Sequence, residues 1–310
     1  MANKYFIIGI FFIALLQISN LILCHSVPLD EGLKEVVLER TEVRRLHSDF
    51  VGQDFELSIS LPRSYNNTNS NYPVIFLLDS YRAFPIVKGM TDALSWPNPI
   101  ISEVIVVGIG YGGQGQEAAL NWVVGRTRDF TPVTNKVREE SYKNRLKGGG
   151  MLDIDIETGG APQFLDFIVK ELFPVIESNY RIDKNLKMLS GYSAGGLFGL
   201  YVLFHNPDLF SKYFIGSPSI TSFQDSITFE YESDYAKSQN DLQADVFMSV
   251  GQLEIENSES MKRIADLMYS RNYKNLKLKT MVFENENHYT CYSVALSKAL
   301  IELFGTIGDQ

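Results

Sequence analysis

Cysteine is scarce in this chain, since only Cys24 and Cys291 occur among 310 residues. If Cys24 is removed with the leader described below, no internal disulfide can form, and the fold must be stable without one. Neither an H-x-x-x-H pair nor a cysteine cluster is present, so we expect no metal site and no cofactor.

Basic charge is also in deficit. The 28 lysines and arginines stand against 37 aspartates and glutamates, which gives a net charge of −9. No basic run interleaves with aromatic residues, so nucleic acid is not an expected partner.

Long apolar runs are missing except at the N-terminus. There Lys4 precedes an apolar stretch over residues 5–16 that is too short to span a bilayer comfortably. This predicts a signal peptide over residues 1–24, a secreted or periplasmic protein without stable membrane insertion, and a single domain over residues 25–310. The residues before Cys24 also resemble a bacterial lipoprotein box, which leaves a lipid anchor there as the alternative.

Short apolar runs recur along the rest of the chain. Residues 54–61 alternate between apolar and polar, which is typical of a half-exposed antiparallel strand. Residues 74–78, 104–107 and 246–250 are continuously apolar, as in strands buried on both faces, and residues 161–178 have the stripe of an amphipathic helix. The alternation predicts an α/β fold with a mostly parallel central sheet and helices on both faces.

One segment carries a catalytic motif. Residues 191–195 read G-Y-S-A-G and lie between an apolar stretch at 186–190 and a helical pattern at 196–205. Strand, G-x-S-x-G and helix is the context of a nucleophile elbow, whose glycines permit a tight turn from which the serine, here Ser193, projects. The amide of Ala194 at the helix N-terminus would then face a developing oxyanion.

A serine hydroxyl is a weak nucleophile and needs a base, which in turn needs an orienting carboxylate. Of the four histidines, His25 borders the leader and His47 precedes the first sheet strands. His205 lies on the helix that follows Ser193, roughly 18 Å away at 1.5 Å per residue. His288 follows the last apolar strand and is therefore the predicted base.

The acid and the second oxyanion donor are expected on loops that follow strands. Glu254 follows the strand at 246–250 and is preferred as the acid, with Glu256 left open. The backbone amides of Ser80 or Tyr81, after the earlier strand, are the candidates for the oxyanion hole.

Residues 111–160 are rich in glycine and charge and have weak periodicity. We expect them to form an irregular loop that shapes the substrate pocket. Within it, Arg126 and Arg128 would project together from an extended segment, and we predict that at least one lines the pocket mouth and binds substrate. The alternative is that both only brace the loop.

Six stretches of the sequence match a known family, at residues 126–132, 159–161, 189–207, 217–219, 250–254 and 287–288. In these stretches the chain resembles the putative esterase family of α/β-hydrolases, which includes siderophore trilactone esterases, feruloyl esterases and S-formylglutathione hydrolase. The resemblance implies an α/β-hydrolase fold with Ser193 as nucleophile, Glu254 as acid and His288 as base.

The chain departs from the family at two places. Asp79-Ser80 stands where relatives have D-G or H-G, and no aromatic pair follows the S-P-S at residues 217–219. The resemblance therefore supports the reaction better than the substrate.

These observations favour a secreted serine esterase that hydrolyses a small-molecule carboxylic ester through an acyl-enzyme. Siderophore-type or other small extracellular esters are the candidate substrates. The alternatives are an acyltransferase of the same fold and a non-catalytic binding protein on a hydrolase scaffold.

Overall fold

The computed structural model describes residues 36–148, 154–221, 225–239 and 241–306. The chain divides into two units, Met1–Leu38 and Glu39–Gln310, and every helix and strand below belongs to the second. The predicted signal peptide over residues 1–24 and the lipidation alternative at Cys24 lie outside the described residues. In the described part of the chain, no helix has both the length and the apolar character needed to cross a bilayer.

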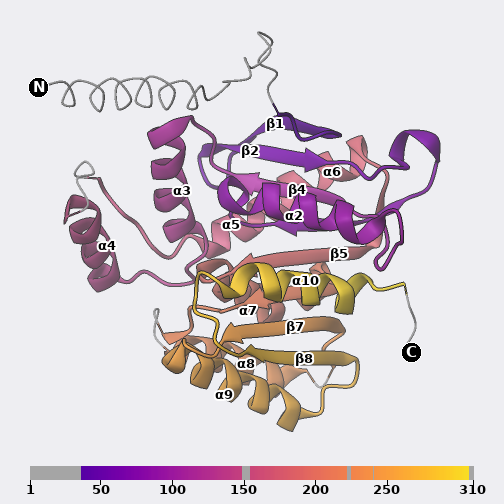
Figure 1. The fold of residues 1–310 in the computed structure, drawn as a ribbon. Coiled ribbons are helices and arrows are strands. Elements are labelled where there is room, and N and C mark those ends of the chain that lie inside the picture. The colour runs from indigo at the N-terminus through magenta and orange to yellow at the C-terminus, as the bar shows by residue number, and fades with distance from the viewer. Residues whose placement is uncertain (1–35, 149–153, 222–224, 240, 307–310) are drawn as a thin grey trace, which may run out of the picture. The chain divides into compact units, whose positions relative to one another are not determined.

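A single sheet organises the larger unit (Figure 1). Its strands are, in chain order, β1 (Thr41–Ser48), β2 (Gln53–Ser60), β3 (Tyr72–Leu77), β4 (Ile105–Gly110), β5 (Ile182–Tyr192), β6 (Lys212–Gly216), β7 (Ala244–Gly251) and β8 (Leu276–Phe283). They lie in the spatial order β1-β2-β4-β3-β5-β6-β7-β8. β1 pairs antiparallel with β2, and β2 antiparallel with β4, whereas all later pairs are parallel. The predicted mostly parallel sheet with an antiparallel leading part is confirmed.

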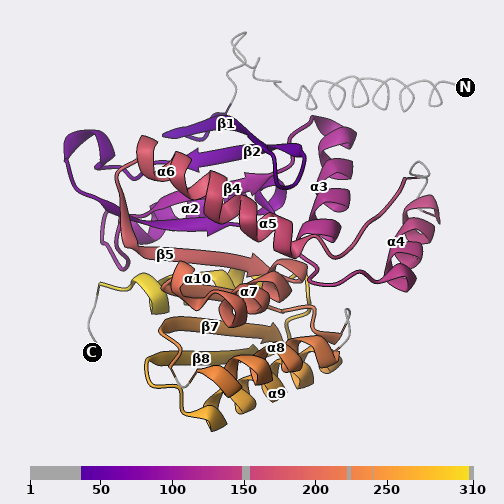
Figure 2. The same cartoon turned by 180° about the vertical axis from the view of Figure 1, so that it is seen from behind.

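Helices cover both faces of this sheet, as Figures 1 and 2 show. α2 (Ser80–Ser95) and α10 (Cys291–Phe304) lie on one face. The other face carries α5 (Ala161–Phe167), η2 (Ile168–Leu172), α6 (Phe173–Asn179), α7 (Ala194–His205), α8 (Asp225–Ser238) and α9 (Ile255–Arg271). Short 3-10 turns follow β2 at η1 (Tyr65–Asn67) and α7 at η3 (Pro207–Leu209). α5, η2 and α6 follow one another without a break, which confirms the helix predicted over residues 161–178.

The pleat of the strands divides the buried side chains between two cores. In β3, Val74 and Phe76 pack with the α5–α9 side, while Ile75 and Leu77 pack with α2 and α10. Successive side chains of a strand point to opposite faces, so a strand between two helical layers must be apolar at every position. This is why the apolar runs predicted these strands correctly.

The irregular loop expected over residues 111–160 is wrong in its secondary structure. The segment contains α3 (Gly115–Asp129) and α4 (Lys136–Gly148). Both helices lie at the end of the sheet where β5, β7 and β8 terminate (Figures 1 and 2). Their place beside the strand ends agrees with a role in shaping the pocket.

These two helices lack the apolar stripe by which helices are recognised. α3 approaches the core through small residues, since a Cβ on Gly125 would lie 2.3 Å from the ring of Tyr111. α4 is strongly polar, and the residues that it buries are Glu139 and Leu146. Close packing of a glycine against an aromatic ring leaves no periodic signal in the sequence.

The sheet ends in two edge strands. β1 exposes Val43, Arg44 and Arg45 along its centre, and β8 exposes Lys277 and Lys279.

Candidate active site

Ser193 lies in a strained turn between β5 and α7. Its φ of 61° and ψ of −120° place a non-glycine residue in a sparsely populated conformation. The turn is held by hydrogen bonds from the amide of Ser193 to the carbonyl of Gly216 (2.9 Å) and from Leu197 to the carbonyl of Ser193 (3.1 Å). A Cβ on Gly191 would lie 2.1 Å from the carbonyl oxygen of Gly195, so the turn requires glycine at position 191.

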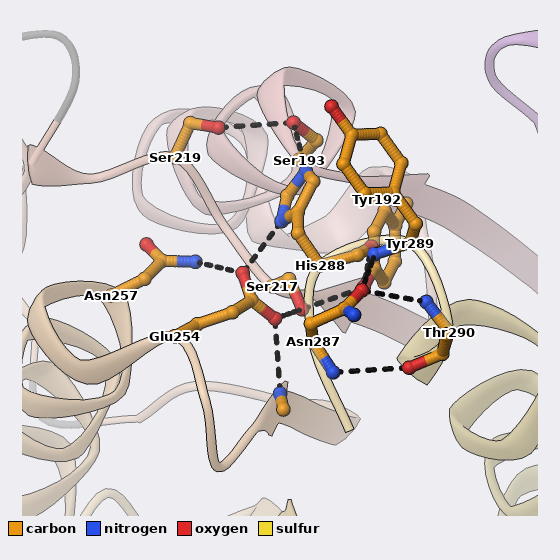
Figure 3. Close-up of polar contacts among 11 residues, drawn as sticks. Tyr192, Ser193, Ser217, Ser219, Glu254, Asn257, Asn287, His288, Tyr289 and Thr290 are labelled. Atoms are coloured by element: carbon orange, nitrogen blue, oxygen red, sulfur yellow. Dashed lines mark hydrogen bonds and ion pairs between the residues drawn. The ribbon is translucent and has the colours of Figure 1, made fainter. Parts of the chain in front are cut away.

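The turn brings Ser193 to His288 and Glu254 (Figure 3). Oγ of Ser193 lies 3.0 Å from Nε2 of His288, and Nδ1 of His288 lies 2.6 Å from Oε2 of Glu254. His288 comes from the turn between β8 and α10, and Glu254 from the N-cap of α9 after β7. Glu256 lies in the first turn of α9, and Glu254 is the carboxylate that contacts the histidine.

Hydrogen bonds keep the Glu254 carboxylate charged although it is largely buried. Burial acts to raise its pKa, but hydrogen bonds from His288, Ser217 and the amide of Gly251 outweigh this and lower the pKa below its ordinary value. Ser217 Oγ and the Gly251 amide donate to Oε1 at 2.8 and 3.0 Å, and Asn257 Nδ2 donates to Oε2 at 3.3 Å. The carboxylate is therefore both ionised and fixed in orientation.

Two residues that the sequence analysis did not single out support this arrangement. The hydroxyl of Tyr192 donates to the carbonyl of His288 (2.9 Å), and Ser217 Oγ lies 2.8 Å from that same hydroxyl. Each hydroxyl carries one proton, so Tyr192 donates its proton to the His288 carbonyl, and Ser217 directs its own toward Glu254 Oε1 and the Tyr192 oxygen. Tyr192 is the variable position of G-x-S-x-G and Ser217 opens the S-P-S stretch, so only the family resemblance marked their neighbourhood.

The side chain of Asn287 fixes the turn that carries the histidine. Its Oδ1 accepts hydrogen bonds from the amides of Tyr289 (2.9 Å) and Thr290 (3.2 Å) (Figure 3). These contacts close the turn directly before α10, and they set the backbone position from which the His288 ring reaches Ser193.

Ser219 contacts Ser193 twice. Its Oγ lies 3.1 Å from Oγ of Ser193, and its amide donates to the carbonyl of Ser193 at 3.1 Å. The S-P-S stretch therefore contacts Glu254 through Ser217 and Ser193 through Ser219.

The candidate oxyanion donors lie at two helix N-termini. Ala194 is the first residue of α7, and Ser80 and Tyr81 are the first two residues of α2. β3 and β5 are parallel neighbours, and the amide of Leu78 bonds to the carbonyl of Ser190 at 3.0 Å, so both helices begin at the same edge of the sheet. The first amides of a helix have no intrahelical acceptor and are open to an anion.

A cavity of about 950 Å³ opens above Ser193. It is lined by residues that include Asp79, Arg82, Ile86, Trp122, Arg126, Arg138, Tyr142, Arg145, Ser219, Leu253, Glu254, Ile255, Glu256, His288, Tyr289 and Tyr292. One side, from α2, α3 and α4, contributes arginines and aromatic rings. The other side, from the loops after β7 and β8, combines apolar Leu253 and Ile255 with the polar side chains of Glu254, Glu256, Asn257 and His288. No group of three metal-binding side chains occurs among the residues that the structure describes.

Arg126 and Arg128 do not project together, because they lie in the last turn of α3 rather than in an extended segment. Arg126 lines the cavity and forms an ion pair with Asp79. Arg128 is not among the cavity-lining residues and forms an ion pair with fully buried Asp129, with a 2.6 Å contact between Nε and Oδ1. Residues two apart on a helix lie about 200° apart around its axis, which separates the two side chains.

Known proteins share this fold and sequence. A family model described as Putative esterase matches residues 48–148 and 125–303. The ferri-bacillibactin esterase BesA of Bacillus subtilis is 33% identical over 272 residues, which cover 84% of this chain and 88% of that protein. The crystal structure of the BES protein from Bacillus cereus superposes with a TM-score of 0.73 at 30% identity, covering 88% of this chain and 99% of that one.

An IroE-like serine hydrolase from Shewanella oneidensis gives a TM-score of 0.71 at 26% identity and covers 85% of this chain and 80% of its own. The sheet topology, the strained turn at Ser193 and these matches all indicate the same fold and family. The chain therefore belongs to the Putative esterase family, has the α/β-hydrolase fold, and is a carboxylic-ester hydrolase.

Proposed function

We propose that Ser193, His288 and Glu254 form the catalytic triad of a serine esterase. The observation that carries the proposal is the continuous chain from Ser193 Oγ through His288 to Glu254, with contacts of 3.0 and 2.6 Å. His288 accepts the proton of Ser193 as its oxygen attacks the ester carbonyl, and it then donates that proton to the leaving alcohol. Glu254 orients the ring and stabilises the imidazolium that forms.

The tetrahedral intermediate requires donors for its oxyanion. The amide of Ala194 and that of Ser80 or Tyr81 are placed for this role at the N-termini of α7 and α2. Collapse of the intermediate leaves an acyl group on Ser193. Water activated by His288 then attacks the acyl-enzyme and releases the acid.

We further propose that the substrate is a siderophore-type ester that carries negative charge and aromatic rings. The cavity is large, and its α2, α3 and α4 side contributes Arg82, Arg138 and Arg145 together with Trp122 and Tyr142. Planar guanidinium groups bind oxyanions and stack on rings. Iron complexes of catecholates have both features, because each catechol loses its protons on binding iron. A relative named ferri-bacillibactin esterase supports this choice.

The apolar segment after Lys4 predicts a signal peptide over residues 1–24, which would direct the protein out of the cytoplasm. We propose that the protein is secreted or periplasmic, or lipid-anchored at Cys24. Mass analysis of the exported chain distinguishes these cases, since a cleaved chain begins near Cys24 and an anchored one carries a lipid on that residue. An exported chain that retains Met1 would contradict both.

The triad is tested by Ser193→Ala and His288→Ala, each of which should lower kcat by about 10⁴-fold or more because triad residues act as a unit. A fluorophosphonate should phosphonylate Ser193 in the wild type, with release of fluoride, and should not label Ser193→Ala. A panel of p-nitrophenyl, feruloyl and catecholate trilactone esters identifies the substrate class. Ester products formed with an added alcohol would reveal an acyltransferase instead, and near-normal hydrolysis by folded Ser193→Ala would exclude the serine mechanism.

A further inference from the structure

A carboxylate, that of Asp79, lies beside the proposed oxyanion hole. Asp79 directly precedes α2 and has left-handed backbone angles (φ 57°, ψ 37°), which aspartate adopts more readily than most residues. On its other side, a Cβ placed on Gly195 would lie 3.5 Å from Oδ2 of Asp79. The carboxylate therefore lies between the N-terminal turn of α2, with Ser80 and Tyr81, and that of α7, with Ala194.

Two side chains of α3 hold this carboxylate. Arg126 donates from Nε to Oδ1 (2.6 Å) and from Nη2 to Oδ2 (3.1 Å), and Trp122 Nε1 donates to Oδ1 (2.7 Å). The Arg126 and Asp79 side chains are only 13% and 14% exposed. Trp122 and Arg126 are four residues apart and so lie on the same side of α3. We call Asp79, Trp122 and Arg126 the Asp79 clamp.

The clamp extends to the residues that follow Asp79. The ring of Trp122 lies 6.1 Å from that of Tyr81, and the guanidinium of Arg82 lies 4.9 Å from the Trp122 ring. α3 therefore contacts Asp79, Tyr81 and Arg82 around the start of α2. These contacts fix the segment whose amides are proposed to bind the oxyanion.

The clamp also neutralises a negative charge beside the proposed oxyanion hole. An oxyanion hole works because fixed positive dipoles face the charge that develops in the transition state. A bare carboxylate at this place would oppose that charge, and more strongly in a buried site than in water. The bidentate guanidinium of Arg126 cancels the charge of Asp79 where the oxyanion forms.

We propose that the Asp79 clamp positions the oxyanion-hole amides and neutralises the carboxylate beside them, so that Arg126 is a positioning residue and not a ligand of the substrate. This inference rests on the proposed serine-esterase function. A positioning role and a substrate-binding role of Arg126 predict different changes in kcat and KM on neutral and anionic esters.

The test compares Arg126→Gln, Asp79→Asn and the double variant, assayed on a neutral p-nitrophenyl ester and on an anionic monoester. Arg126→Gln leaves an uncompensated anion and should lower kcat by about 100-fold on both esters, with little change in KM. Asp79→Asn loses the clamp but leaves no anion, and should cost about 10-fold. The double variant should return to the level of Asp79→Asn, so that removing the carboxylate rescues loss of the arginine.

A second readout separates positioning from stability. Affinity for a trifluoromethyl ketone, which forms an oxyanion on Ser193, should fall in parallel with kcat across the three variants. Arg271→Gln is a matched control. Arg271 also forms a bidentate pair, since its Nε and Nη2 each lie 3.0 Å from an oxygen of buried Glu232. Glu232 likewise accepts a third hydrogen bond, from the hydroxyl of Tyr273. That control should lower stability and leave kcat unchanged.

A double variant that is worse than Arg126→Gln would overturn the proposal, as would a loss confined to KM for the anionic ester. An unchanged kcat in folded Arg126→Gln would also overturn the proposal. If the wild type neither hydrolyses esters nor is labelled at Ser193, the serine-esterase function itself fails. The wild-type measurements therefore separate failure of that function from failure of the clamp.

Discussion

Glu254, the N-cap of α9, and Glu256, in the first turn of that helix, are two residues apart, yet their contacts differ sharply. Both line the cavity, but Glu254 contacts His288, Ser217 and the Gly251 amide, whereas Glu256 does not contact the histidine. Glu254→Gln should lower kcat on a neutral ester by about 10³- to 10⁴-fold, since the histidine loses its orienting charge. Glu256→Gln is the matched control and should have a far smaller effect, and the reverse order would show that the acid has been misassigned.

The lowered pKa of Glu254 also predicts how stability depends on pH. A carboxyl whose pKa is depressed on folding stabilises the native state above its ordinary pKa of 4.5, and that contribution is lost as pH falls through the depressed value. We expect acidification from about pH 7 to about pH 4 to reduce the free energy of unfolding more in the wild type than in Glu254→Gln. Urea unfolding at both pH values measures the difference, and parallel losses would show that Glu254 does not contribute.

Sequence reasoning reached Ser193, His288 and Glu254 because each has a local signal: a motif, a scarce residue type, or a place after a strand. Tyr192 and Ser217 have no such signal. Their roles depend on which hydroxyl meets which carbonyl in three dimensions, and a hydroxyl residue next to a motif is common. Arg126 was singled out, but its partner Asp79 lies 47 residues away and could not be paired with it.

Among the secondary-structure elements, the turn between β5 and α7 depends most on one small residue. Gly191→Ala would place a methyl group 2.1 Å from the Gly195 carbonyl oxygen, which is backbone and cannot move without opening the elbow. We expect destabilisation above about 4 kcal/mol or loss of folded protein. Gly89→Ala in α2 is the control, because a Cβ there meets nothing within 4 Å and should add up to about 1 kcal/mol of helix stability. A normal melting temperature for Gly191→Ala would contradict this description of the turn.

The end of α3 provides a second test at this scale. Arg128 pairs with Asp129, whose side chain is fully buried and whose pKa is raised by that burial even though Arg128 favours the charged form. Arg128→Ala leaves a buried carboxylate without its partner and should cost about 3–5 kcal/mol of stability, measured by urea unfolding. Lys237→Ala breaks an exposed pair with Asp234 and should cost at most about 1 kcal/mol. Equal effects of the two substitutions would show that Arg128 does not stabilise the end of α3 through Asp129.

At the scale of the whole molecule, the alternation of apolar runs and helical stripes was enough to predict the sheet type. It could not predict the strand order, because β4 lies between β2 and β3 although it follows both in sequence. Nor could it predict that α3 and α4 are helices, since neither has an apolar stripe. The position of α3 depends on long-range contacts such as those of Trp122 and Arg126 with Asp79, which produce no periodic pattern in the sequence.

The two edge strands have a consequence for how copies of the protein meet. An open strand edge is a template on which a second chain can pair, and exposed β1 and β8 would join copies into a continuous sheet. β1 carries Arg44 and Arg45, and β8 carries Lys277 and Lys279. Arg44 is paired with Glu42 and Lys277 with Asp245, but an approach of like or unlike edges still brings Arg45 or Lys279 toward basic side chains of the other edge, even though the chain as a whole is acidic. The lysines and arginines of the two edges therefore oppose edge-to-edge pairing through their local charge, which differs in sign from the net charge of the chain.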